Sequence, residues 1–341
     1  MSQTDSTNYP ELPASKILML VGSILLGIVV AILLAPTVFK AVPTDLARTN
    51  VLLTTLSSGE HQPKYVVFGN SVVMQGIDTR ILSEYLQGQP TGYNLSSTGQ
   101  NLLESALYYQ ELPDSVDTIV QVVYPKLLMA AEMINLQKYN AMYMFGYRPD
   151  EETRQMMYEV YVSKPENLLG RSTVDQYFIS RWAARQTIDT AVRNRVRSDM
   201  TLDAARNDLF FPSSRGDAMT PAKLELDLIR ASATIREKPF TIYQSPERQI
   251  QAMADFAKRT GRRFVLISSP LHPEAQKYED PAFRADANAW FKEFARRNDI
   301  LYIDTINYLP ADLFIDGLHP SEQGAEILSR HIGEQLAQGG L

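Results

Sequence analysis

The sequence predicts an α/β domain with a parallel sheet, preceded by a long apolar helix. Short β-branched runs at 64–69, 118–124 and 263–268 each end beside a Gly or Pro, which predicts buried strands. The segments 246–260 and 281–297 carry apolar residues at helical spacing. Strands that alternate with amphipathic helices indicate a parallel sheet with helices on both faces.

Shorter segments complete the predicted domain. The runs 92–95 and 300–304 predict two further strands, 102–110 predicts a helix, and a last helix is expected from Pro320 onward. The stretch 126–245 shows no strand pattern. We therefore expect one α/β domain with a mainly helical insertion.

The N-terminal part divides into three segments. Residues 1–16 form a polar tail, 17–39 an uncharged apolar stretch, and 40–63 a short helix with a linker before the domain at 64–341. The apolar stretch is long enough to cross a bilayer core of roughly 30 Å as a helix. We therefore expect a single transmembrane anchor at 17–39.

A cleaved signal peptide is the alternative interpretation of that stretch. Such a peptide has a basic start and an apolar core of roughly 7–15 residues. Here Asp5 and Glu11 outnumber Lys16, and the apolar stretch is longer, so the retained anchor is favoured. Lys16 on one side is balanced by Lys40 and Arg48 on the other, and the basic residues therefore give no orientation.

The composition excludes several classes of function. A formal net charge of −6 argues against nucleic acid as a partner, because phosphate binding needs a basic face. The absence of cysteine excludes disulfides, thiolate-bound metals and a cysteine nucleophile. The sequence has no His, Asp or Glu cluster with metal-ligand spacing and no Gly-rich phosphate loop, so neither a metal nor a cofactor is expected.

Ser71 lies on the turn that follows the first predicted strand. Gly69-Asn70-Ser71 closes that strand, and functional groups gather at the carboxyl ends of parallel strands. The N–H groups of a helix that starts there would favour a developing negative charge. Ser71 is therefore a candidate nucleophile, although Gly, Asn and Ser are also ordinary turn and N-cap residues.

Asp316 and His319 form a second candidate motif, just before the last predicted helix. At this spacing in a turn, the carboxylate can reach the imidazole Nδ1–H, which leaves Nε2 as a general base. Pro320 suits the first helical position. The alternative is an exposed loop in which Asp316 caps the helix. His61 and His272 have no carboxylate at comparable spacing.

The loop 94–101 after the second predicted strand is the third candidate. Its Gly99 would let a backbone N–H approach a substrate oxyanion closely. A plain polar loop is the alternative, and on this motif alone it is favoured.

Taken in order, the three motifs resemble those of the SGNH (GDSL-like) hydrolase family. The block at 69–71 matches the family's opening block, Gly99 its second-block glycine, and Asp316 and His319 its closing Asp-x-x-His. The resemblance implies a flavodoxin-like three-layer α/β/α fold and a catalytic triad of Ser71, His319 and Asp316. It also implies oxyanion donors at Ser71 and Gly99.

The resemblance covers about residues 64–125 and 246–335, and two positions depart from it. Asn70 stands where the family has Asp, and the third block, Gly-x-Asn, is absent because the third strand runs into 124–126. In typical members that Asn donates to the oxyanion, and losing one such donor costs roughly 10²–10³ in rate. The candidates to replace it are Asn101, Gln100 and Tyr124.

The resemblance implies a serine-dependent esterase or O-acyltransferase, with acetyl as the expected acyl group. The single N-terminal helix, the altered third block and the insertion are most similar to the family's envelope accessory branch. Members of that branch work beside membrane-bound O-acyltransferases on polysaccharides such as alginate, cellulose or teichoic acids. The branch implies a cytoplasmic (inner) membrane protein whose domain lies in the periplasm, with an envelope polysaccharide or acyl ester as its substrate.

Two other functions stay open. One is a catalytically silent scaffold or glycan-binding protein that recruits an acyltransferase, which the missing third-block Asn favours. The other is a lipase or thioesterase at the membrane surface.

Two further features have both a structural and a functional interpretation. A run of arginines predicts a solvated helix face or a cradle for an anionic glycan or lipid headgroups. Its members are Arg181, Arg185, Arg193, Arg195 and Arg197. The segment 139–147 is rich in aromatic and Met side chains, for which packing onto the core is favoured over sugar stacking or a partner interface.

Overall fold

The computed structural model describes most of the chain. The described residues are 13–41, 45–129, 136–160, 174–175, 177, 207–213, 218–233, 235 and 239–341. The arginine run at 181–197 lies outside them. The described part of the predicted insertion includes three helices, as expected: α6 (Leu136–Met144), α7 (Glu151–Val160) and α10 (Pro221–Ser232).

Five parallel strands form the central sheet, in the order β2-β1-β3-β4-β5. The strands are β1 (Tyr65–Phe68), β2 (Gly92–Asn94), β3 (Thr118–Val123), β4 (Arg263–Ser268) and β5 (Leu301–Ile303). In β1, Val67 is in register with Asn94 on one side and with Val120 on the other. Each strand lies within a run that the sequence predicted, and the parallel sheet confirms the α/β class.

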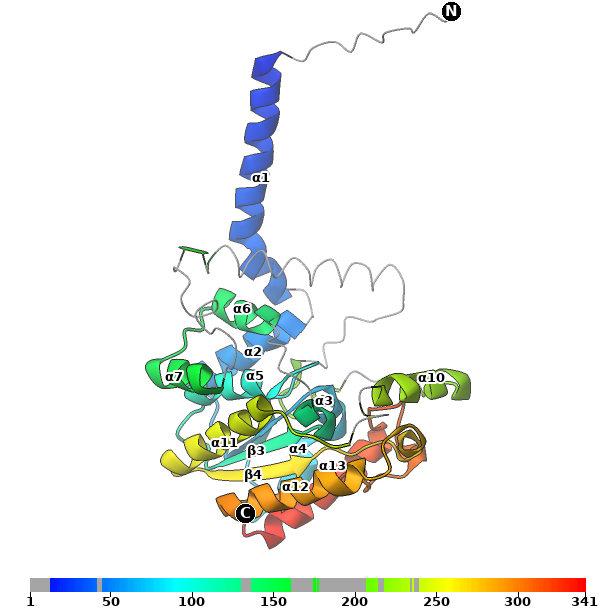
Figure 1. The fold of residues 1–341 in the computed structure, drawn as a ribbon. Coiled ribbons are helices and arrows are strands. Elements are labelled where there is room, and N and C mark those ends of the chain that lie inside the picture. Colours follow the sequence, from blue (N-terminus) through cyan, green and yellow to red (C-terminus); the bar gives the residue numbers. More distant parts are fainter. Residues whose placement is uncertain are drawn as a thin grey trace, which may run out of the picture.

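Helices cover both faces of the sheet (Figure 1). One face carries α2 (Asp45–Ser57), α5 (Leu102–Leu107), α11 (Gln244–Arg259) and α12 (Phe283–Asn298). The other face carries α3 (Ser71–Gly76), α4 (Thr79–Tyr85) and α13 (Glu322–Gln338). Short 3-10 turns are η1 (Tyr109–Glu111), η2 (Pro125–Met129), η4 (Pro273–Tyr278) and η5 (Ala311–Leu313).

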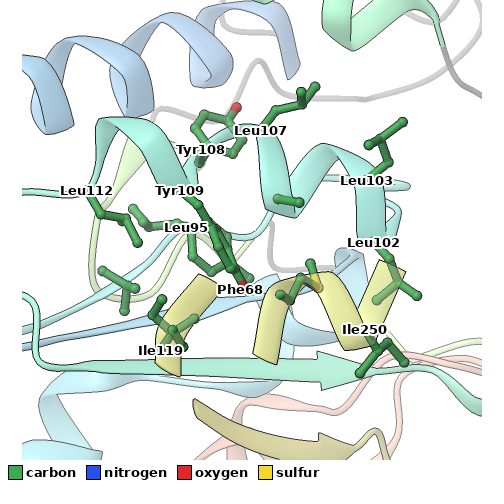
Figure 2. Packing of buried hydrophobic residues seen from close by; sticks show 14 of the residues in the cluster. Phe68, Leu95, Leu102, Leu103, Leu107, Tyr108, Tyr109, Leu112, Ile119 and Ile250 are labelled. Carbon is green, nitrogen blue, oxygen red and sulfur yellow. The ribbon is translucent and has the colours of Figure 1, made fainter. Parts of the chain in front are cut away.

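Strand side chains alternate between two hydrophobic cores. On β1, Val66 and Phe68 face the layer of α5 and α11, whereas Val67 faces the layer of α13. Figure 2 shows the first core, in which Phe68 and Ile119 of the sheet lie beneath Tyr109. Because the strands are covered on both faces, they read in sequence as continuous apolar runs.

The N-terminal helix α1 (Ala14–Ala41) is long and apolar enough to cross a membrane. It projects away from the α/β domain (Figure 1). Against the described part of the domain, α1 packs through its last turns: Phe39 is buried in a cluster with Leu46 of α2 and with Ala141 and Met144 of α6. The end of α1 is therefore joined to the domain by side-chain contacts as well as by the chain.

Helix α2 is part of the core of the α/β domain. Its Leu52 and Leu56 are buried in the same cluster as Val66 of β1, and Arg48 is fully buried. The short helix expected within 40–63 is therefore present, and it packs as an integral layer of the domain.

The aromatic and Met side chains of 139–147 are packed inward. Tyr139, Met142 and Tyr147 are buried in the core that also contains α2. The Tyr147 hydroxyl donates to the Leu107 carbonyl at 2.7 Å. These contacts agree with the packing interpretation of the segment.

The last helix begins two residues later than predicted. Pro320 forms an isolated antiparallel bridge with Phe314, so its backbone closes a turn instead of opening the helix. Ser321 is the N-cap of α13, and its hydroxyl accepts the N–H of Gly324 at 3.1 Å. The assignment of Pro320 to the first helical position is therefore wrong.

Candidate active site

The carboxyl ends of β1 and β3 lie at the point where the strand order reverses. β1 has β2 on one side and β3 on the other. In open parallel sheets, such a switch point forms the crevice where ligands bind. Ser71 is the first residue of α3, three residues after the end of β1, and so lies beside this switch point.

Gly69 and Asn70 shape the turn between β1 and α3. A Cβ atom on Gly69 would collide with the Val73 side chain and approach the Val122 carbonyl oxygen to 3.2 Å, so the turn requires glycine. Asn70 is the N-cap of α3, and its Oδ1 accepts the N–H of Val72 at 3.0 Å. An Asp would cap the helix in the same way, so the Asn at this position preserves the local structure.

The Asp316–His319 segment folds into a tight turn before α13. Asp316 Oδ1 accepts the backbone N–H groups of Leu318, at 2.8 Å, and His319, at 2.7 Å. The N–H of Ile315 donates to the His319 carbonyl at 2.9 Å. These bonds hold the carboxylate and the imidazole in a fixed relation to each other.

The structure brings Ser71, His319 and Asp316 into one hydrogen-bonded chain. Asp316 Oδ2 lies 2.7 Å from His319 Nδ1, and His319 Nε2 lies 2.9 Å from Ser71 Oγ. A carboxylate on Nδ1 favours the tautomer with its proton there, which leaves Nε2 to accept the proton of Ser71. The side chains of His319 and Asp316 are 18% and 17% exposed. The hydrogen-bonded side chains are therefore largely shielded from solvent but remain partly accessible.

Asp316 is held in its ionised form. Burial raises the pKa of a carboxyl group, but here the hydrogen bonds from the His319 ring and from two backbone N–H groups outweigh burial. The pKa of Asp316 therefore lies below its ordinary value. An ionised carboxylate at this position stabilises the positive charge that the imidazole acquires when it takes up a proton.

The loop that contains Gly99 lies beside the turn between β1 and α3. The N–H of Ser97 donates to the Gly69 carbonyl at 3.3 Å, and the Thr98 hydroxyl contacts the sulfur of Met74 in α3 at 3.7 Å. Gly99 itself is exposed and has a φ of +62°, a left-handed conformation that favours glycine. The predicted second donor thus belongs to a loop that is attached to α3.

The three side chains considered as replacements for the missing Asn are differently placed. Asn101 caps α5 in a capping box with Glu104, so its side-chain oxygen is used within the helix terminus. Gln100 is buried and bonds Ser97 and Ser105. Burial of the Tyr124 phenol raises its pKa, so the group stays neutral and can act only as a neutral donor.

Helix α10 and the segment just before it also contact the Asp316–His319 turn, which the sequence did not predict. Asp227 Oδ2 accepts the N–H of Gly317 at 3.0 Å, and the N–H of Met219 donates to the Ile315 carbonyl at 2.7 Å. No local pattern links these segments, which are far apart in the sequence.

A second histidine, His272, lies near the Asp316–His319 turn. The His272 ring lies 4.8 Å from that of Phe314, and its Nδ1 accepts the N–H of Glu274 at 3.2 Å. Burial lowers the pKa of His272, so the ring is neutral and serves as an N-cap of η4.

No family model matches this chain, and no curated protein matches it. The parallel sheet order and the hydrogen-bonded Ser71–His319–Asp316 chain therefore carry the functional interpretation.

Proposed function

We propose that this protein is a membrane-anchored serine esterase or O-acyltransferase of the SGNH type. The observation that carries the proposal is the chain from Ser71 Oγ through His319 to Asp316, with distances of 2.9 Å and 2.7 Å. An activated serine nucleophile needs a base within hydrogen-bond reach and a third group that orients the base. His319 and Asp316 meet these two requirements, and they do so at the switch point of the sheet, where ligands bind in open parallel sheets.

The reaction begins with attack on an acyl ester. Ser71 Oγ forms a bond to the carbonyl carbon while His319 Nε2 takes the hydroxyl proton, and Asp316 stabilises the imidazolium. Collapse of the tetrahedral intermediate breaks the ester C–O bond, and the imidazolium returns the proton to the departing alkoxide. An acyl-serine remains. Water or a sugar hydroxyl then attacks the acyl carbon and gives its proton to His319. The acyl carbon–Oγ bond breaks, and the imidazolium returns the proton to Ser71 Oγ.

Backbone N–H groups at Ser71 and Gly99 are the proposed oxyanion donors. The position of Ser71 at the start of α3 supports the first, because the N-terminal N–H groups of a helix are free. The attachment of the Gly99 loop to Gly69 supports the second. Because Asn101 is an N-cap, we assign the hole to two backbone donors, with the Asn101 amide as a further candidate.

The assignment to the SGNH family rests on two features taken together. The strand order 2-1-3-4-5 is compatible with that fold, and the motifs around Ser71, Gly99 and His319 occur in the family's order. The same resemblance gives the proposed substrate, an acetylated cell-envelope polysaccharide, and the proposed partner, a membrane-bound O-acyltransferase.

Retention of α1 as an anchor is supported by its packing. Phe39 is buried against α2 and α6. Cleavage that removed α1 together with Phe39 would therefore expose the apolar side chains of α2 and α6 that it covers. We propose that α1 spans the cytoplasmic membrane and that the α/β domain lies on the periplasmic side.

The proposal is tested with the full chain in detergent micelles and with 4-nitrophenyl acetate as the acyl donor. We expect a burst of 4-nitrophenol and an acetyl mass increase on the peptide with Ser71. Both should be absent in Ser71→Ala and retained in Ser58→Ala, which changes an exposed serine in the turn after α2. Adding acceptor oligosaccharides then separates transfer, which gives acetylated sugar, from hydrolysis, which gives acetate.

The silent scaffold is the second candidate function. It is favoured by the absence of the third-block Asn, since β3 runs directly into Tyr124 and η2. A wild-type chain that gives neither burst nor adduct, both alone and in membranes with its acyltransferase, would support the scaffold.

A further inference from the structure

Arg48 is a fully buried arginine on α2, the helix that follows the apolar N-terminal helix. Arginine is rarely buried completely, because its guanidinium must be satisfied by acceptors inside the protein. The hydrogen bonds of Arg48 therefore fix both its side chain and the segments that supply the acceptors.

The guanidinium donates to carbonyl groups of two segments. Its Nε lies 2.6 Å from the Ser96 oxygen and its Nη2 lies 2.8 Å from the Asn94 oxygen. Its Nη1 lies 3.2 Å from the Asp208 oxygen. The Asn94 and Ser96 acceptors belong to the loop 94–101, which also contains Gly99.

Asn94 extends these contacts to the nucleophile helix. Its side-chain amide donates to the carbonyl groups of Val73, at 3.1 Å, and Ile77, at 2.8 Å. Its Oδ1 accepts from the N–H and the hydroxyl of Ser96. The side chains of Asn94 and Ser96 are fully buried, so water does not compete for these bonds.

We propose that Arg48 is a positioning residue that fixes the loop 94–101 against α3. Through it, the membrane-proximal helix α2 sets the distance between the oxyanion loop and Ser71. The catalytic consequence rests on the proposed function, whereas the positional role rests on the contacts alone. Helix α2 then has two roles: it packs in the core of the α/β domain, and it positions the loop that contains Gly99.

The expected effect on rate follows from geometry. A displacement of about 1 Å at a reacting group costs about 10²-fold in rate. Loss of the Arg48 contacts should therefore slow acylation of Ser71 by about 10- to 100-fold. The pH dependence should not change, because His319 and Asp316 lie on a different element.

The experiment uses the full chain in detergent micelles, with Arg48→Lys and Arg48→Met. Hydrogen–deuterium exchange is measured on peptides that cover 94–101 and the strands, and the 4-nitrophenyl acetate burst is followed against pH. Arg284→Met is the matched control, because Arg284 is also a buried arginine but bonds Glu279. If Arg48→Met does not fold, Ser96→Ala removes one bond of the same network with a smaller change.

We expect exchange at 94–101 to rise at least about tenfold in Arg48→Met, with less change in Arg48→Lys and none in Arg284→Met. The burst rate should fall by about 10- to 100-fold at an unchanged pH midpoint.

A uniform rise in exchange across the strands, or unchanged exchange at 94–101, would overturn the positional role. A loosened loop with an unchanged burst rate would overturn its catalytic consequence. A wild-type chain without a burst would instead contradict the proposed function, and exchange would still decide whether Arg48 fixes the loop.

Discussion

The N–H of Gly317 donates to the carboxylate of Asp227, with 3.0 Å between nitrogen and Oδ2. A Cβ atom on Gly317 would lie 2.9 Å from that oxygen and 3.3 Å from the Leu228 nitrogen. Helix α10 and the Asp316–His319 turn therefore approach each other closely at Gly317, and a methyl group there would require the Asp227 side chain or the helix backbone to shift. The turn that presents His319 is thus supported from outside as well as by its own hydrogen bonds.

Gly317→Ala is expected to displace the Asp316–His319 turn. The added methyl group should cost about 1–3 kcal/mol of stability and, by moving His319, slow acylation by about 10²-fold. Asp227→Ala should also lower the acylation rate. Asp227→Asn keeps an acceptor, and its acylation rate should stay close to that of wild type. Burst kinetics and thermal unfolding of the three variants measure this. Full activity in Gly317→Ala would show that α10 does not position the turn.

Asp316→Asn is expected to lower the acylation rate by about 10⁴-fold at neutral pH. The amide would place the wrong tautomer of His319 toward Ser71 and would not stabilise the imidazolium. The change is nearly isosteric, so the thermal stability serves as a control for folding. A decrease of less than tenfold in single-turnover acylation would argue against Asp316 as the third triad member.

His272 should make the fold sensitive to mild acid. Its pKa in the folded chain is lowered, chiefly by burial, so the unfolded chain takes up the proton first. The stability linked to neutral His272 is therefore fully present above the ordinary pKa of 6.5. It is lost as the pH falls through that value toward the lower pKa of the folded chain. Unfolding temperatures measured from about pH 7.5 to 5.5 should fall more steeply in wild type than in His272→Asn, which keeps an N-cap acceptor. Parallel curves would exclude His272 as the source.

The proposed membrane orientation can be determined by labelling single introduced cysteines, because the chain has no cysteine of its own. Lys292→Cys lies on an exposed position of α12 and Ser15→Cys at the start of α1. In cells with an intact cytoplasmic membrane, a membrane-impermeant maleimide should label Lys292→Cys, and should label Ser15→Cys only after lysis. The reverse pattern would place the domain in the cytoplasm. Release of the domain as a shorter soluble chain would indicate a cleaved signal peptide.

Local patterns account for what the sequence predicted well. Buried parallel strands such as β1 and β3 are continuous apolar runs, so their positions could be found without the structure. The Asp316–His319 pair was also predictable, because a separation of three residues in a turn already brings the two side chains together. The Gly69 turn places Ser71 at the carboxyl end of β1 by the same local logic.

Contacts between distant segments could not be predicted in this way. Arg48 looks like an ordinary basic residue beside an apolar helix, and only the folded chain shows that it holds the loop at 94–96. The contact between Asp227 and Gly317 joins the insertion to the Asp316–His319 turn and leaves no periodic signal in the sequence. Pro320 was misassigned because proline suits the first turn of a helix, whereas its backbone here pairs with Phe314.

The most direct measurement is the site and rate of reaction with a fluorophosphonate, which traps an activated serine as a stable phosphonate ester. The full chain would be treated in detergent micelles and its peptides analysed by mass spectrometry, beside Ser71→Ala, His319→Ala and the control Ser58→Ala. The account predicts one adduct, on Ser71. It should be absent in Ser71→Ala, slowed at least about 10³-fold in His319→Ala and unchanged in Ser58→Ala. A folded wild-type chain that gives no adduct on Ser71, or that reacts equally fast without the His319 imidazole, would contradict it.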